Sequence, residues 1–234
     1  MLFRSFDAGE LTSVHSYYEL YGLVRKHIDA AHMEGEPKAE IIRNPERFVD
    51  LDPDTALALL DQRNAGKQLL LITNSEWSYT EAMMRYAFDP FLPEGMTWRS
   101  LFDLVIVAAN KPDFFSSRAP FLEIASEDGL LRPVVGDLAH DRAYWGGHAG
   151  GVEKFLGLSG DEILYVGDHI FGDVHVSKDV LRWRTALIVR ELEHEVVETE
   201  RGRSGLEALA GLMAEKEALE REHRQTRLPL PRKK

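Results

Sequence analysis

The chain has 234 residues, contains no cysteine, and carries a formal net charge of −11 at pH 7. The lack of cysteine excludes disulfides and thiolate metal sites. The acidic balance argues against a nucleic acid polymer or an anionic membrane as the main partner, because both attract basic proteins. No run approaches the roughly 20 apolar residues of a membrane span, and the N-terminus lacks the apolar stretch of a signal peptide. We therefore expect a soluble, cytoplasmic protein.

The N-terminal part of the chain predicts two helices. Apolar residues recur at helical spacing over residues 14–32, and Gly35 and Pro37 are expected to end this helix. A second helix is expected over residues 53–65, with Pro53 in its first turn and Gly66 as its stop.

Four short apolar runs predict the strands of a parallel α/β sheet. Helical segments are expected between them, around residues 79–88, 151–156 and 174–181, and this alternation is typical of such a sheet. Runs that are apolar throughout are typical of strands buried on both faces. The four runs are residues 69–73, 104–108, 163–166 and 185–189.

The chain after Glu191 is charged and helical, and the run Arg201-Gly202-Arg203-Ser204-Gly205 is expected to interrupt it. A modest apolar stripe follows, formed by Leu206, Leu209, Leu212, Met213 and Leu219. Two interpretations stay open: a terminal helix docked on the core, or a helix that pairs with a partner. The stripe is too short for a sustained heptad pattern.

Polar residues follow the first two predicted strands, at the ends where doubly wound sheets bind ligands. The Thr73 hydroxyl and the N–H groups of Asn74 and Ser75 make an anion site at a helix entrance, or Asn74 or Ser75 merely caps that helix. Lys111 precedes Pro112, which favours extended backbone. Its ammonium is either a point charge for phosphate or a surface lysine in a turn.

The third predicted strand leads into Gly167-Asp168-His169-Ile170-Phe171-Gly172-Asp173. Two carboxylates at this spacing, Asp168 at the strand end and Asp173 five residues on, suit a hard cation that prefers oxygen ligands. The other interpretation is a Gly-Asp turn followed by an Asp cap on the helix near residue 174.

The order of these three sets resembles the last three motifs of the haloacid dehalogenase (HAD) superfamily. Several blocks resemble its cytosolic purine 5′-nucleotidase family, the IMP- and GMP-specific HAD-IG group. The resemblance covers about residues 17–191. The blocks are LLLITNSEWSYTEAMMRYAF, WRSLFDLVIVAANKPDFF, GGVEKFLGLSGDEILYVGDHIFGDV and WRTALIVREL.

This resemblance implies an α/β fold, a HAD-like Rossmannoid parallel sheet with flanking helices, and Mg²⁺-dependent hydrolysis of purine nucleoside 5′-monophosphates. Thr73, Asn74 and Lys111 would hold the phosphoryl oxygens, and Asp168 and Asp173 the Mg²⁺. The residue types alone indicate only that Arg25 and Asp29 could form an exposed ion pair of little energetic weight. Implied base-binding residues are Arg25, Asp29, His32 and Lys38.

The superfamily's nucleophile motif, DxDx[TV], is not found. The nearest candidate, Asp7, has no second aspartate at the required spacing and no apolar strand before it, so we reject it. We expect the nucleophile, its acid/base partner and the central strand to lie upstream, and the chain alone to be inactive. The implied division is a helical cap remnant (1–50), a partial α/β core (51–192) and a C-terminal helix with a basic tail (193–234).

Two other hypotheses stay open beside this one. The chain could be a non-catalytic nucleotide- or Mg²⁺-binding subunit that associates with a second copy or a complementing chain. It could also be a truncated gene product with no separate function. A purine nucleoside monophosphate is the expected substrate, with neither a nucleic acid polymer nor a membrane as partner.

Overall fold

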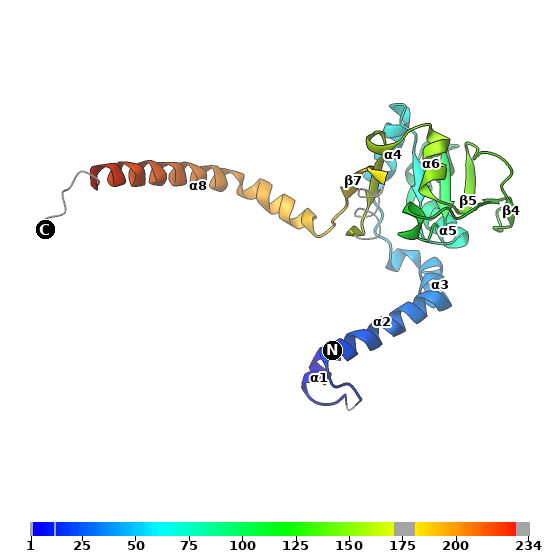
Figure 1. The fold of residues 1–234 in the computed structure, drawn as a ribbon, viewed down its shortest axis with the longest axis horizontal. Helices are drawn as coiled ribbons and strands as arrows, with labels where there is room; N and C mark the ends of the chain where they lie inside the picture. Colours follow the sequence, from blue (N-terminus) through cyan, green and yellow to red (C-terminus); the bar gives the residue numbers. More distant parts are fainter. Residues whose placement is uncertain (1, 12, 171–180, 228–234) are drawn as a thin grey trace.

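The computed structural model describes residues 2–11, 13–170 and 181–227, and at Leu2, Asp29, 32–34 and Arg227 the backbone only. Figure 1 shows a compact α/β body with two extensions, the N-terminal helices on one side and a long C-terminal helix on another. This arrangement confirms the expected mixed α/β fold with a mainly parallel sheet and flanking helices.

The described strands form two sheets. A five-stranded sheet has the order β1-β2-β5-β3-β4, and a two-stranded sheet pairs β6 with β7. Strands β1, β2 and β5 run parallel, β3 is antiparallel to β5 and β4, and β6 and β7 are parallel. The bounds are β1 Leu70–Ile72, β2 Leu104–Val107, β3 Phe121–Ile124, β4 Leu131–Pro133, β5 Arg142–Gly146, β6 Leu164–Gly167 and β7 Arg184–Leu187.

Strand β2 lies at the centre of the core. All four of its residues are buried, because β1 and β5 flank its edges and apolar residues pack on both faces. One face packs with Phe115, Tyr165 and Trp183, so the core continues from the larger sheet to β6 and β7. The prediction of a fully apolar, buried strand at residues 104–108 is therefore confirmed for residues 104–107, with Ala108 just past the strand end.

The sequence prediction missed β3, β4 and β5. Strand β5 begins with Arg142 and has three consecutive apolar residues, Ala143, Tyr144 and Trp145, and β3 carries Glu123 in its middle. Neither has a continuous apolar run as long as those used to find the other strands. Their stability comes from pairing with each other and with β2, a long-range effect that no local window shows.

Strands β6 and β7 are not buried on both faces, so that prediction is wrong for them. The side chains of Leu164 and Val166 are 60% and 53% exposed, whereas Tyr165 between them is 7% exposed. The alternation arises because only one face of β6 packs on the shared core. On the other face the apolar side chains of Leu164, Val166 and Ile188 are open to solvent.

The helices agree with the sequence in most places. Ser16 caps α2 through the Glu19 N–H at 3.1 Å, Gly35 ends it in the left-handed conformation, and Asp52 caps α4. Pro37 does not end a helix, because it lies in the first turn of α3, where a missing N–H is tolerated. The bounds are α1 Leu2–Asp7, α2 Tyr17–Glu34, α3 Glu36–Arg43, α4 Pro53–Asn64, α5 Trp77–Phe88 and α6 Ala149–Leu156.

The C-terminal helix α8 is continuous over Leu192–Arg227. The expected interruption at residues 201–205 is therefore wrong, although Figure 1 shows α8 bending in its first half. Gly202 and Gly205 are the residues most able to permit such a bend. Within the described residues, no helix combines the length and apolar character needed to cross a bilayer.

Candidate functional site

Thr73 directly follows β1, where the chain turns toward α5. Its N–H donates to the Ile106 carbonyl at 2.9 Å and its carbonyl accepts from the Ala109 N–H at 3.0 Å, which continues the β1–β2 ladder. Its hydroxyl accepts from the Ser75 N–H at 3.1 Å. These bonds fix the turn so that the hydroxyl lies at the carboxyl end of the sheet.

The Asn74 side chain binds the loop that carries Lys111. Its Oδ1 accepts from the Lys111 N–H at 2.6 Å, and its Nδ2 donates to the Lys111 carbonyl at 3.0 Å. Helix α5 instead has Glu76 at its cap position, with no capping bond from a side chain. The alternative in which Asn74 caps this helix is therefore wrong, because its amide is used on Lys111.

The Lys111 ammonium extends back across the carboxyl ends of two strands. Its Nζ lies 3.3 Å from the Ile72 carbonyl at the end of β1 and 2.8 Å from the Tyr165 hydroxyl of β6. It also lies 5.5 Å from the centroid of the Tyr165 ring, within the range of a cation–π contact. Lys111 is half-buried and held, which excludes the interpretation of a freely solvated lysine in a turn.

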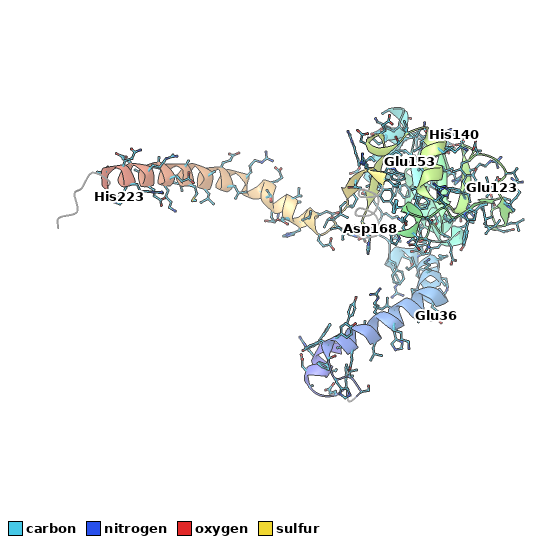
Figure 2. All side chains as sticks on the ribbon, viewed as in Figure 1. Glu36, Glu123, His140, Glu153, Asp168 and His223 are labelled. Atoms are coloured by element: carbon cyan, nitrogen blue, oxygen red, sulfur yellow. The ribbon has the colours of Figure 1, made fainter. Side chains whose placement is uncertain are left out.

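Asp168 follows β6 immediately and is exposed. Figure 2 shows it on the side of the α/β body from which α3 and α2 extend. It lies three residues after Tyr165, the residue that accepts from Lys111. Asp173 and the segment expected to form the following helix lie outside the described residues. Over the described ranges, no group of three or more His, Asp or Glu side chains is close enough to form a metal centre.

A cleft of about 460 Å³ opens beside this site at the carboxyl ends of β1, β2 and β5. Asn74 lines one wall, Asn110 and Ser117 add polar groups, and Trp145 forms an aromatic wall. Gly147, at φ +88°, has Phe121 packed so closely that no Cβ could be added. The lining of the cleft therefore combines apolar side chains with hydrogen-bonding groups.

The four predicted base-binding residues lie on α2 and α3. Lys38 of α3 places its Nζ 5.4 Å from the centroid of the Tyr79 ring, in the first turn of α5. Because α5 follows Thr73 and Asn74 directly, this contact brings Lys38 to the same end of the sheet. Arg25 is exposed on α2, which Figure 1 shows running away from the body. The side chains of Asp29 and His32 lie outside the described residues.

Sequence reasoning missed Tyr165 and Trp145. A tyrosine inside the apolar run 163–166 was a signal, since its hydroxyl needs a hydrogen-bonding partner once the ring is buried. Here the partner is Lys111. The Tyr165 ring packs edge-to-face with Phe115 and at a tilt to Trp183. Trp145 had no comparable signal, because its role as a cleft wall depends on the unpredicted strand β5.

Residues 3–233 match the model of the 5′ nucleotidase family. The chain belongs to this family. It is also similar to 5′-nucleotidase domain-containing protein 2 of Rattus norvegicus, with 34% identity over 216 residues. The match covers 87% of this chain and 36% of that protein, so the chain spans about a third of the length of this curated relative.

Proposed function

We propose that this chain provides the phosphate-binding part of a Mg²⁺-dependent phosphatase that acts on purine nucleoside 5′-monophosphates, namely IMP and GMP. The observation that carries the proposal is the fixed position of Lys111 between the end of β1 and β6. A cation held at the carboxyl end of a sheet, beside a hydroxyl and the backbone N–H of Asn74 in the turn, suits a phosphoryl group.

Each of the three strand-end residues has a role in this proposal. The Thr73 hydroxyl and the Asn74 backbone N–H would donate to phosphoryl oxygens, and Lys111 Nζ would offset their charge. Phosphoryl transfer depends mostly on positioning and on stabilisation of charge. The Asn74 side chain would act indirectly, because its two bonds to Lys111 set the course of the loop.

The two predicted metal ligands are both carboxylates, and Mg²⁺ prefers carboxylate oxygens and water as ligands. Asp168 and Asp173 would hold the ion, Asp168 at the strand end and Asp173 as support. Bound there, Mg²⁺ would offset the negative charge of the phosphoryl group. With only these carboxylates from the chain, the remaining ligands would be water, phosphoryl oxygens or residues from elsewhere in the protein.

The nucleophile would come from a strand between β1 and β6. Among the described strands, β1 pairs only with β2, and β6 pairs only with β7. A parallel strand at this position would end beside Thr73 and Asp168. Following the superfamily resemblance, its first aspartate would attack phosphorus and break the bond to the 5′ oxygen. A second aspartate would protonate that oxygen and then activate water.

Asp7 does not meet this requirement. It ends helix α1, and its carboxylate accepts a hydrogen bond from the Tyr17 hydroxyl. The superfamily nucleophile lies at the end of a central strand, whereas Asp7 lies at the end of a helix. These observations support the prediction that Asp7 is not the nucleophile.

Base selection would belong to α2 and α3. Arg25 can donate to O6 and N7 of a 6-oxopurine, as arginine does with guanine. Asp29 can accept the N1–H that hypoxanthine and guanine have and adenine lacks. Lys38 contacts the body through the ring of Tyr79. His32 is assigned to the same pocket from the resemblance.

One observation favours a second candidate function. Because neither the described strands nor Asp7 offers a nucleophile, the chain could bind nucleotide and Mg²⁺ without turning it over. Reading the DNA upstream of Met1 in all three frames distinguishes the hypotheses. A DxDxT strand in frame supports the enzyme, one in another frame supports a truncated product, and none supports the binding subunit.

The enzymatic test measures phosphate release from IMP with Mg²⁺. The chain alone should release none, and a version that includes the nucleophile strand should release phosphate and lose this activity in Asp168→Asn. Release by the chain alone, lost in Asp168→Asn but retained in Asp7→Asn, would show that no strand is missing. If the active version hydrolysed AMP as fast as IMP, the assigned base pocket would be wrong.

A further inference from the structure

Helix α8 exposes a short apolar face in its central part. Every described side chain from Leu192 to Thr226 is exposed. Figure 1 shows the helix extending away from the sheets, and in Figure 2 His223 marks its far end. The ion pairs of its described side chains are formed within the helix, for example Arg201 with Glu198 and Arg224 with Glu220. The described residues of the α/β body therefore contribute nothing to the packing of this face.

An isolated helix of this composition is not expected to be stable in water. Gly202, Gly205 and Gly211 lie inside it, and each costs about 0.5–1 kcal/mol relative to alanine. Long helices in proteins gain most of their stability from packing of an apolar face. A further packing surface is therefore needed.

The apolar face is short and central. Leu209 lies three residues after Leu206, and Leu212 and Met213 lie three and four residues after Leu209, so the four share one side of the helix. Their exposed fractions run from 46% to 64%. Leu219 continues the stripe, and a shallow groove lies between Leu212 and Leu219. Since this groove is lined by α8 alone, it is an open surface and not a ligand cavity.

Charge is distributed unevenly along the same helix. Residues 192–200 contain four glutamates and no lysine or arginine, whereas residues 221–227 contain three arginines and one glutamate. Two such helices side by side in the same direction would place the acidic ends together. In opposite directions, each acidic end would face the basic end of the other.

We propose that α8 forms an antiparallel pair with α8 of a second copy of this chain, centred near Leu209. A two-fold axis at this position makes one patch complementary to itself. Leu206 then faces the second copy's Leu212, and Gly205 faces its Met213, where a small residue leaves room for a large one. Residues 193–200, with four glutamates, then lie opposite residues 218–225, which carry two arginines and two glutamates. A parallel pair would instead place the four glutamates of each copy side by side.

The first test is the oligomeric state of the full chain, measured by sedimentation equilibrium. The chain should dimerise reversibly. Leu209→Lys should raise the dimer dissociation constant more than about tenfold, because two leucines leave the interface and two charges enter it. Ala218→Lys is the matched control. It adds the same charge on the opposite side of the helix and should leave the dissociation constant unchanged.

The second test measures orientation. The chain has no cysteine, so Val196→Cys accepts a single spin label on a side of α8 away from the stripe. Antiparallel helices centred at Leu209 place the two labels about 40 Å apart, from a rise of 1.5 Å per residue. Parallel helices place them within roughly 10–20 Å, because paired helix axes lie 8–10 Å apart.

Three outcomes would overturn the proposal. A chain that stays monomeric at all concentrations leaves the stripe to a different protein. A dimer that Leu209→Lys does not weaken uses another surface. A short distance between the labels shows a parallel pair. None of these outcomes bears on nucleotide hydrolysis, so the proposal and the proposed function are tested separately.

Discussion

Asn74 holds Lys111 at both of its backbone hydrogen-bonding groups. The side-chain amide accepts from the Lys111 N–H at 2.6 Å and donates to the Lys111 carbonyl at 3.0 Å. A side chain next to the β1 turn thus fixes a loop 37 residues away in sequence. The pairing explains how residues after two different strands form one site.

Replacing Asn74 should loosen this loop. Asn74→Ala removes both bonds and should lower the free energy of unfolding by about 1–2 kcal/mol, measured by urea denaturation. Asn74→Asp keeps an acceptor for the Lys111 N–H but has no donor for its carbonyl, so a smaller loss is expected. Amide hydrogen exchange at Lys111 should become faster in both variants.

Asn44→Ala is the control for this prediction. The Asn44 side chain makes one local bond, to Glu40 at 3.0 Å, so its loss should not change exchange at Lys111. If the Asn74 variants left exchange at Lys111 as slow as in the unaltered chain, the two bonds would not determine the loop position.

Lys111 should contribute to binding of a nucleoside monophosphate. Lys111→Met removes the charge that spans β1 and β6 and should weaken IMP binding at least about tenfold, as measured by calorimetry with Mg²⁺ present. Lys154→Met, which removes an exposed ion pair with Asp137 on the surface of α6, should bind as the unaltered chain does. Equal affinities in all three proteins would remove Lys111 from the phosphate site.

Gly147 should not tolerate a side chain. A Cβ there would lie 2.0 Å from Phe121 Cε1, and φ is +88°. Gly147→Ala should therefore lower the free energy of unfolding by about 3 kcal/mol, from overpacking and backbone strain together. Thermal or urea denaturation measures this change.

Gly150→Ala is the matched control, three residues away. Its Cβ would make an ordinary contact, 3.5 Å from His148 Cδ2, within helix α6. This variant should be neutral or more stable by up to about 1 kcal/mol, because alanine favours a helix. Similar losses in both variants would contradict the packing of Phe121 on Gly147.

Glu123 should make the pairing of β3 with β4 depend on pH. The hydrogen bond from Arg132 lowers the pKa of the Glu123 carboxyl, with further lowering by the charges of Arg132 and Arg142. Because this pKa is lower in the folded chain than in the unfolded chain, the ionised Glu123 stabilises the fold at any pH above its unfolded-state pKa of about 4.3. This stabilisation is lost as the pH falls through the folded-state pKa.

The measurement is a comparison with Glu123→Gln. The unaltered chain should be more stable than this variant at neutral pH, and the difference should disappear at acidic pH. Glu94→Gln, which changes an exposed loop carboxylate, should show a much smaller difference. A difference at Glu123 that stayed constant with pH would show that its charge does not stabilise the strand pair.

The sequence alone determined the local parts of this protein. Strand β2 and helices α4 and α5 were predictable because apolar runs, Pro53 and Gly66 act over a few residues. The placement of Thr73, Lys111 and Asp168 after strands was predictable for the same reason. An apolar run followed directly by polar residues indicates the end of a strand, whatever other elements surround that strand in the fold.

Only the tertiary structure decided what these residues contact. The bonds from Asn74 to Lys111 and from Lys111 to Tyr165 join residues 37 and 54 positions apart, and no local pattern encodes such pairs. Strand β5 forms because β2 and β3 flank it, although its own residues are a weak strand signal. Helix α8 stays continuous through three glycines, and its exposed stripe indicates that a further long-range contact completes it.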